Sequence, residues 1–390
     1  AAGLSVLTGG VPIDIDYDTP LIGVYVGLAT LQISEFVFVQ GSFAYEAGAR
    51  RKVTVDTGTS FGDLNFLSTG LQLEAAGLFS DVSLSSDWRT ISNVEVETTL
   101  LGISHANVFV GYGIPDWKSD TPIRDQEGVF GLAIADINVA MAIMKPTGTL
   151  ADLLPEFTSL KASASEFVVA GGGDIFQLFG QDIEVRMNWG DGWKNSPETK
   201  PSIDFVQSFG PEGLAVPTGS EPIYLDFAGG AFIEASIQNA TLMLSQFVYV
   251  QGDFAFRKGG SREVTVDYGI LGTIKGVRTN TIEFGANNVQ AFIGVGGPYI
   301  QDSNRDGYVI DHDITVGGVT YTADSINADA IGIVVNDLNF GMTILTTQAP
   351  NILANPKSIL VPEGTKFTAL RATGQQIAMV GLPSELEFSF

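Results

Sequence analysis

The sequence contains no cysteine and only two histidines, and just 20 of its 390 residues are lysine or arginine. The absence of cysteine excludes disulfide bonds, thiol chemistry and thiolate metal sites. Two histidines, His105 and His312, leave little for zinc binding or histidine-based catalysis. The chain also lacks any uninterrupted stretch of about 18 apolar residues, so the sequence predicts no transmembrane helix.

Acidic residues dominate the charge of the chain. Aspartate and glutamate number 44, and the formal net charge is −24. A surface this negative repels phosphate backbones and anionic lipid, so we expect no nucleic-acid partner and no membrane insertion. Hydrophobic residues make up 45% of the sequence, which excludes wholesale disorder.

The residues that are abundant favour strands and tight turns. The chain has 46 glycines and 25 phenylalanines, together with many valines and threonines. Strand-like segments separated by Gly, Asn and Asp clusters are predicted at 22–26, 31–39, 52–56, 94–98, 106–110, 137–143, 167–170 and 183–187. Only 149–156 and 322–330 favour short helices. We therefore expect an all-β protein, sandwich-like or solenoid-like.

The sequence resembles itself at an offset of about 210 residues. FVFVQGSFAY at 36–45 matches FVYVQGDFAF at 247–256, and RKVTVD at 51–56 matches REVTVD at 262–267. GLSV at 3–6 likewise matches GLAV at 213–216, and FTSLKA at 157–162 matches FTALRA at 367–372. This predicts two tandem β-rich repeats, 1–212 and 213–390. The second carries an insertion between Pro298 and Asp337, and it is truncated at its C-terminal end relative to the first.

A metal-binding pattern lies inside that insertion. Residues 302–313 follow the spacing D-x-N-x-D-G-x-x-x-x-x-D. Oxygen ligands at alternating positions, a glycine for the turn and a distal carboxylate can wrap a hard divalent cation. We expect calcium to be bound by the side chains of three residues, by a carbonyl and by a closing carboxylate; in chain order these are Asp302, Asn304, Asp306, Tyr308 and Asp313. The alternative is a solvated Asn/Asp-rich turn.

Two further motifs leave other functions open. Val-Asp-Thr-Gly-Thr-Ser at 55–60 resembles the active-site loop of pepsin-like aspartic proteases, and the second repeat offers Asp267-Tyr268-Gly269 as its partner. That chemistry needs two carboxylates sharing one proton, here Asp56 and Asp267. Trp189 and Trp193 flank a polar turn that could stack on a sugar ring, which would suit a calcium-dependent glycan-binding module.

The repeated segments give the chain a family resemblance. FVFVQGSFAYEAG with FVYVQGDFAFRKG, and FTSLKASASEFVVAGG with FTALRATGQQIAMVGL, resemble large repetitive secreted bacterial surface proteins of the adhesin and calcium-binding surface-layer type. The 302–313 pattern resembles EF-hand-like, dockerin-type calcium loops, with Asp in place of the usual glutamate. The resemblance implies an extracellular or cell-surface, non-catalytic structural module. We expect it to form part of a layer, filament or adhesin, with copies of itself or further repeats of the same parent chain as partners. Surface glycans are a further candidate partner.

Overall fold

A computed structural model shows how the chain folds. It describes residues 4–8, 10–15, 21–34, 36–59, 82–173, 175–193, 199–303, 309–310, 312–316, 318–350 and 355–382. Nearly every regular element in these ranges is a strand, which confirms the all-β prediction. The one α-helix described is the five-residue α2 (Phe205–Phe209), and no helix in the described ranges is long and apolar enough to span a membrane.

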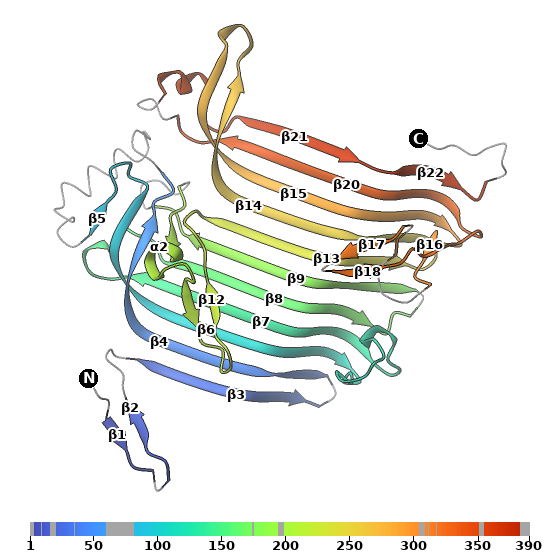
Figure 1. Cartoon of the computed structure of the whole chain (residues 1–390), viewed down its shortest axis with the longest axis horizontal. Coiled ribbons are helices and arrows are strands. Elements are labelled where there is room, and N and C mark those ends of the chain that lie inside the picture. Colours follow the sequence, from blue (N-terminus) through green and yellow to red (C-terminus); the bar gives the residue numbers. More distant parts are fainter. Residues whose placement is uncertain are drawn as a thin grey trace.

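The long strands form one antiparallel sheet of 14 strands (Figure 1). Its first half-sheet contains β3 (Ile22–Ile33), β4 (Val37–Asp56), β6 (Thr90–Tyr112), β7 (Phe130–Pro146), β8 (Phe157–Ala170) and β9 (Phe176–Gly190). The second half-sheet contains β13 (Phe232–Leu244), β14 (Val248–Asp267), β15 (Thr273–Val295), β20 (Ile331–Thr347), β21 (Lys366–Thr373) and β22 (Gln376–Val380). The short strands β5 (Ser83–Leu84) and β10 (Ser202–Asp204) complete it. Instead of separate sandwiches, both halves of the chain contribute to this single sheet.

Strands at matching positions of the two half-sheets pair in the same register. Ile22 pairs with Ala47 between β3 and β4, and Ile233 pairs with Lys258 between β13 and β14. β4 and β14 are both 20 residues long, and β6 and β15 are both 23. The sheet nevertheless crosses residue 212 without a break, because β9 pairs directly with β13. The division into two repeat units therefore stays a prediction.

A line of β-bulges crosses the middle of the sheet. The residue at the bulge has a positive φ of 45–50° in six strands, and the residues are His105, Asp136, Asp182, Asn239, Asn288 and Asp337. Asn, Asp and His tolerate this left-handed conformation better than most residues. Neighbouring side chains satisfy the displaced backbone: Asn138 Oδ1 accepts from the N–H of His105 at 3.1 Å, and Asn339 Oδ1 accepts from the N–H of Asn288 at 3.0 Å. Because bulges bend a strand and increase its twist, this line explains the sharp twist at mid-sheet.

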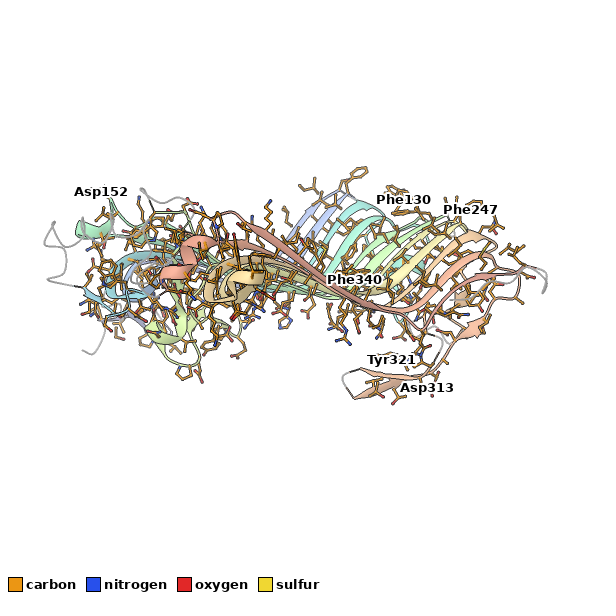
Figure 2. The ribbon with its side chains drawn as sticks, turned by 90° about the horizontal axis from the view of Figure 1, so that it is seen from above. Phe130, Asp152, Phe247, Asp313, Tyr321 and Phe340 are labelled. Carbon is orange, nitrogen blue, oxygen red and sulfur yellow. The ribbon has the colours of Figure 1, made fainter. Side chains whose placement is uncertain are left out.

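The two faces of the sheet differ in what covers them. The described residues of segments 113–129, 191–231 and 297–330 pack on one side, here called the covered face. They bury the apolar clusters around Phe109, Phe157 and Phe292. The opposite side, the open face, carries exposed apolar residues around Val110 and Ile293, and no described segment packs on them. Figure 2 shows Phe130 and Phe247 on the side away from Asp313 and Tyr321. One open-face row runs across the whole sheet through paired positions: Ile33, Val37, Val110, Leu132, Val169, Leu178, Leu242, Val250, Ala291, Val335 and Ile377.

The remaining short elements lie at the ends of the sheet and in the covering segments. They are β1 (Leu4–Val6), β2 (Ile13–Ile15), β11 (Leu214–Val216), β12 (Ile223–Leu225), β16 (Ile300–Gln301), β17 (Ile314–Val316), β18 (Val319–Tyr321), β19 (Ser325–Ile326) and the 3-10 turns η2 (Ile123–Asp125), η3 (Gly148–Leu150), η4 (Gly269–Leu271) and η5 (Pro356–Leu360). Of the two predicted helices, 149–156 forms only the 3-10 turn η3. The other, 322–330, is wrong: it contains the strand β19, because the segment extends along β16.

Candidate functional site

The structure describes only part of the predicted calcium loop. Asn304, Asp306 and Tyr308 lie outside the described residues, whereas Asp302 and Asp313 lie within them. Asp313 Oδ1 accepts a hydrogen bond from the N–H of Ala323 at 2.8 Å. Within the described ranges, no group of three or more His, Cys, Asp or Glu residues could hold a metal ion. Calcium binding by this loop therefore stays a prediction.

Asp324, which sequence reasoning missed, holds both ends of this loop. Its Oδ1 accepts from the N–H of Ser303 at 2.9 Å, and its Oδ2 accepts from the N–H of Ile310 at 3.3 Å. The segment is tied to the sheet where the N–H of Val309 donates to Gln251 Oε1 at 2.8 Å. The loop is thus part of a cover over the second half-sheet. A cation bound there would stabilise that cover.

The two aspartates of the protease hypothesis do not form a carboxylate pair. Each ends a long strand and accepts a hydrogen bond from a glycine N–H two residues later: Gly58 to Asp56 at 2.8 Å and Gly269 to Asp267 at 2.9 Å. Burial raises the pKa of Asp56, and the carboxylate that acts on it is Asp204, not Asp267. The cleft that Asp56 lines does not include Asp267. The shared-proton dyad of an aspartic protease is therefore not assembled here.

The two tryptophans of the glycan hypothesis are not presented together. Trp193 is fully buried, and its indole N–H donates to the carbonyl of Thr57 at 2.9 Å, which fixes a loop to the end of β4. Trp189 is half-buried, with the Lys200 ammonium 5.7 Å from its ring centroid. Because the ring of Trp193 is buried, the two rings do not form one exposed surface, and the pairing of Trp189 with Trp193 as a sugar-stacking site was wrong.

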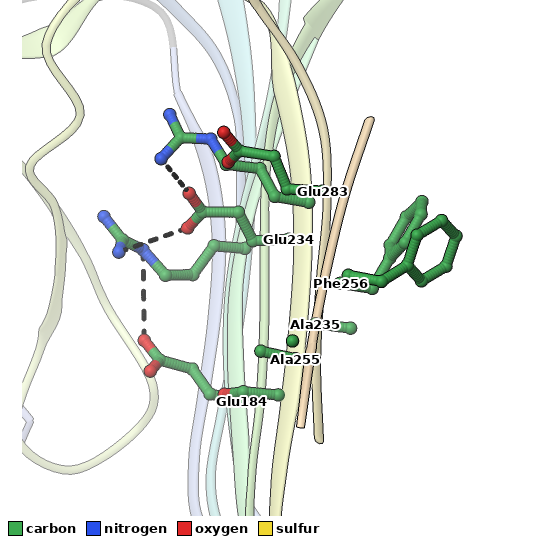
Figure 3. Close-up of a pocket in the computed structure, with 11 residues that line it drawn as sticks. Glu184, Glu234, Ala235, Ala255, Phe256 and Glu283 are labelled. Carbon is green, nitrogen blue, oxygen red and sulfur yellow. Dashed lines mark ion pairs between the residues drawn. The ribbon is translucent and has the colours of Figure 1, made fainter. Parts of the chain in front are cut away.

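A charged network occupies the covered face where the two half-sheets join. Glu234 pairs with Arg257 at 2.8 Å and with Arg186 at 3.3 Å. Figure 3 shows Glu184, Glu234 and Glu283 on one side of the sheet and Phe256 on the other. A cavity of about 330 Å³ opens over this network and over the small residues Ala255 and Gly285. A larger cleft of about 1260 Å³ adjoins it, and both cavities are lined by Arg186, Glu234 and Arg257.

Both lateral edges of the sheet have unused pairing capacity. Among the described strands, β3 pairs only with β4, and at the opposite edge β21 and β22 pair only with β20. β3 is exposed along nearly its whole length, with Leu31 and Ile33 more than half exposed. Its counterpart β13 pairs on both sides, with β14 and with β9. The outer edge of β3 therefore corresponds to the edge of β13 that pairs with β9.

The sequence predicts one bend or bulge, at Gln40-Gly41, but sequence reasoning missed the line of bulges across the sheet and the small-residue positions on the covered face. Signals for the bulges were present: Asp-x-Asn occurs at 136–138 and again at 337–339. Gly102, Gly285 and Gly341 gave no such signal, because isolated glycines in strands are common in a chain with 46 of them.

Comparison with known proteins adds no family to this description. No protein-family model matches the chain, and neither curated proteins nor solved structures give a significant match.

Proposed function

We propose that the chain is a non-catalytic structural module of an extracellular or cell-surface array, such as an adhesin, layer or filament, in which neighbouring copies extend one β-sheet. The observation that carries this proposal is the junction between β9 and β13. There the end of the first half-sheet continues into the start of the second through ten paired positions, from Phe232–Asn188 to Leu244–Phe176. The free edge of β3 has the strand geometry to make the same junction with a neighbour.

The register of β3 supports this use of its edge. β3 and β13 carry the same bulge relative to their next strand, between Val26 and Ala29 and between Ile237 and Ala240. A strand that fits the outer edge of β13 therefore meets the same backbone pattern on β3. Long exposed edges with apolar side chains pair readily with other strands unless charge or proline blocks them, and β3 contains neither (IGVYVGLATLQI).

The apolar open face is a second reason to expect association. Contiguous exposed apolar surface on a protein in water marks a surface that contacts something else. Val110, Phe130 and Ile293 are each more than half exposed on it. Calcium has a place in the proposal as a ligand of the 302–313 loop, where it would neutralise clustered carboxylates and rigidify the cover of the second half-sheet.

Edge pairing can be tested by placing charge on β3. We expect the wild-type chain to form concentration-dependent oligomers in sedimentation velocity. Leu31→Lys with Ile33→Lys should reduce oligomer formation at least tenfold, because lysines on an edge strand oppose pairing. The matched control is Leu132→Lys, which puts a lysine on the open face of the internal strand β7 and leaves both edges unchanged. A wild-type chain that stays monomeric at millimolar concentration would refute the proposal.

A further inference from the structure

One hairpin of the chain is docked on the covered face of the first half-sheet. β11 and β12 form it, and it contacts β6, β7 and β8. Leu214 and Val216 on β11 are buried, with exposed fractions of 4% and 0%. At its turn, the Ser104 hydroxyl donates to Thr218 Oγ1 at 3.0 Å. The hairpin therefore belongs to the core of the first half-sheet, although the strand that follows it, β13, begins the second.

The docked hairpin sits on a strip of very small residues. Ala44, Gly102 and Ala140 are paired across β4, β6 and β7 and are all buried. A Cβ on Gly102 would lie 1.8 Å from the carbonyl oxygen of Pro217, so only glycine admits the hairpin there. At the end of the strip, Lys161 Nζ pairs with Asp226 Oδ1 at 3.1 Å and reaches the carbonyl oxygen of Tyr224 at 3.4 Å.

The N-terminal hairpin of β1 and β2 has the sequence and geometry of the docked one. GLSVLTGGVPIDID at 3–16 matches GLAVPTGSEPIYLD at 213–226. Leu4 pairs with Ile15 as Leu214 pairs with Leu225. Thr8 Oγ1 donates to the carbonyl oxygen of Val11 at 2.8 Å, the same turn bond that Thr218 makes with Glu221 at 2.8 Å.

This N-terminal hairpin is nevertheless exposed. Leu4 is 69% exposed and Val6 is 39% exposed, although they match Leu214 and Val216. Leu7 and Val11 at its turn are more than four-fifths exposed. Figure 1 shows β1 and β2 below the sheet, beside the free edge of β3 and clear of the covered face. A preformed apolar hairpin therefore has no acceptor within the described part of its own chain.

The second half-sheet has the matching acceptor strip, and no residue that the structure describes covers it. Ala255, Gly285 and Gly341 are paired across β14, β15 and β20, in the positions of Ala44, Gly102 and Ala140. A Cβ on Gly285 or Gly341 would meet nothing within 4 Å. Arg371, exposed on β21, is paired with Gly341 as Lys161 is paired with Ala140. The cavity of about 330 Å³ lies over this strip.

We propose that the β1–β2 hairpin of one copy docks on the Ala255–Gly285–Gly341 strip of a second copy. The proposal rests on the assembly function above and names the contact that directs it. In this contact Arg371 takes the position that Lys161 has in the first half-sheet. Because the hairpin and its acceptor are different surfaces of each chain, the contact is heterologous, and it builds an open series where the rotation between successive copies does not close a ring. We expect copies to join head to tail in such a series.

The acceptor strips of the two half-sheets differ in the polarity of a neighbouring residue, and this difference affects the strength of the contact. Glu283 on β15 occupies the position that Leu100 holds on β6, next to the strip. Its carboxylate pairs with Arg262 at 3.0 Å. The second acceptor is thus more polar than the first. The intermolecular contact should therefore be weaker and more sensitive to salt than the intramolecular one, as suits a reversible joint.

A disulfide can trap the contact, because the chain has no cysteine to compete. Thr8→Cys is introduced in one chain and Asn287→Cys in a second chain that carries an added tag, since these exposed positions match Thr218 and Ser104. After oxidation of the mixture, we expect the yield of covalent heterodimer to be at least ten times the yield from a control mixture. In the control, Thr8→Cys is mixed with Ser165→Cys, a substitution at an exposed residue of the first half-sheet. Ser104→Cys with Thr218→Cys in a single chain is the positive control and should close an intramolecular bridge.

The outcomes separate this inference from the proposed function. If the wild-type chain assembles but the Thr8–Asn287 yield equals the Ser165 control, the hairpin inference is wrong and edge pairing stands alone. If the cross-link forms tenfold above control but the concentrated wild-type chain remains monomeric, the hairpin contact is supported and the assembly function is wrong. Salt at 1 M should reduce the cross-link yield, and Gly285→Leu, which fills the strip, should abolish it.

Discussion

The two half-sheets follow one strand plan but end in different states. In the first, the covered face is complete: a hairpin fills the strip at Gly102, and Val216 is wholly buried. In the second, the matching strip at Gly285 is bare, while a hairpin of the same sequence pattern, with Leu4 and Val6 exposed, extends from the other end of the chain. The two hairpins therefore share their strand pairing, but the β11–β12 hairpin belongs to the core and the β1–β2 hairpin to the surface. The difference shows that hairpin geometry is encoded locally and its burial is decided by which neighbour is present.

The largest effect should come from charging the two hairpins. Val216→Asp places a carboxylate in a site with no exposure and should destabilise the fold by about 4 kcal/mol. Val6→Asp changes a surface residue and should alter the free energy of unfolding by less than about 0.5 kcal/mol. Urea unfolding of both variants measures the contrast. Equal losses would contradict the assignment of one hairpin to the core and the other to the surface.

A matched glycine pair should give the next largest difference. Gly102→Val drives a side chain into the backbone of Pro217 and should cost about 3 kcal/mol by overpacking. Gly285→Val meets empty space in the isolated chain and should leave its thermal midpoint almost unchanged while weakening assembly. The measurement is thermal unfolding at low protein concentration, followed by sedimentation at high concentration. A large destabilisation by Gly285→Val in dilute solution would mean that its strip is already filled.

Calcium should act on the second half-sheet alone. If the 302–313 loop binds the ion when folded, calcium at 100 times its Kd raises the free energy of unfolding by about 2.7 kcal/mol. Chelation should remove this gain, and Asp306→Ala should abolish it. Asp120→Ala, in the corresponding cover of the first half-sheet, should leave the calcium response unchanged. A midpoint that is the same with calcium and with chelator would reduce the loop to a simple turn.

The smallest effect concerns the ion pair that ends the occupied strip. Burial acts to raise the pKa of Asp226, but the hydrogen bond and charge of Lys161 outweigh it and lower the pKa. This stabilisation is present above the unfolded-state pKa and is lost as pH falls through the folded-state pKa. Lys161→Met should cost about 0.5 kcal/mol at neutral pH and nothing at pH 2, because the pair is partly exposed. A loss of equal size at both pH values would show that Lys161 acts by packing alone.

The sequence predicts the strands better than their arrangement. Alternating segments such as 36–45 predict strands, because side-chain period and turn residues are local. The Gln40-Gly41 bend is also found where it is expected, as a register shift between Gln40 and Ser42. The single sheet was not predictable, because it depends on the β9–β13 pairing across residue 212. No local pattern specifies which strand edge finds which neighbour.

The candidate sites show the same limit. Val-Asp-x-Gly occurs at 55–58 and again at 266–269, but at both places the aspartate ends a strand and accepts a hydrogen bond from the glycine N–H. Only the three-dimensional structure separates such an Asx turn from a catalytic loop. Trp193 lies beside a polar turn in the sequence, which suggested an exposed stacking residue. In the structure it is buried, and its indole N–H donates to the carbonyl of Thr57. The hairpin match of 3–16 with 213–226 is visible in the sequence. Its meaning becomes visible only when one copy is seen buried and the other exposed.

Head-to-tail docking is tested most directly by mixing a donor-only chain with an acceptor-only chain. Gly285→Leu blocks the acceptor strip, and Leu4→Asp with Val6→Asp disables the hairpin; both retain the other surface. Sedimentation equilibrium should find wild-type chains in an open series of oligomers, each variant alone monomeric, and the mixture as a 1:1 heterodimer that grows no further. Oligomers of wild-type size in either variant alone, or a mixture that stays monomeric, would contradict the account.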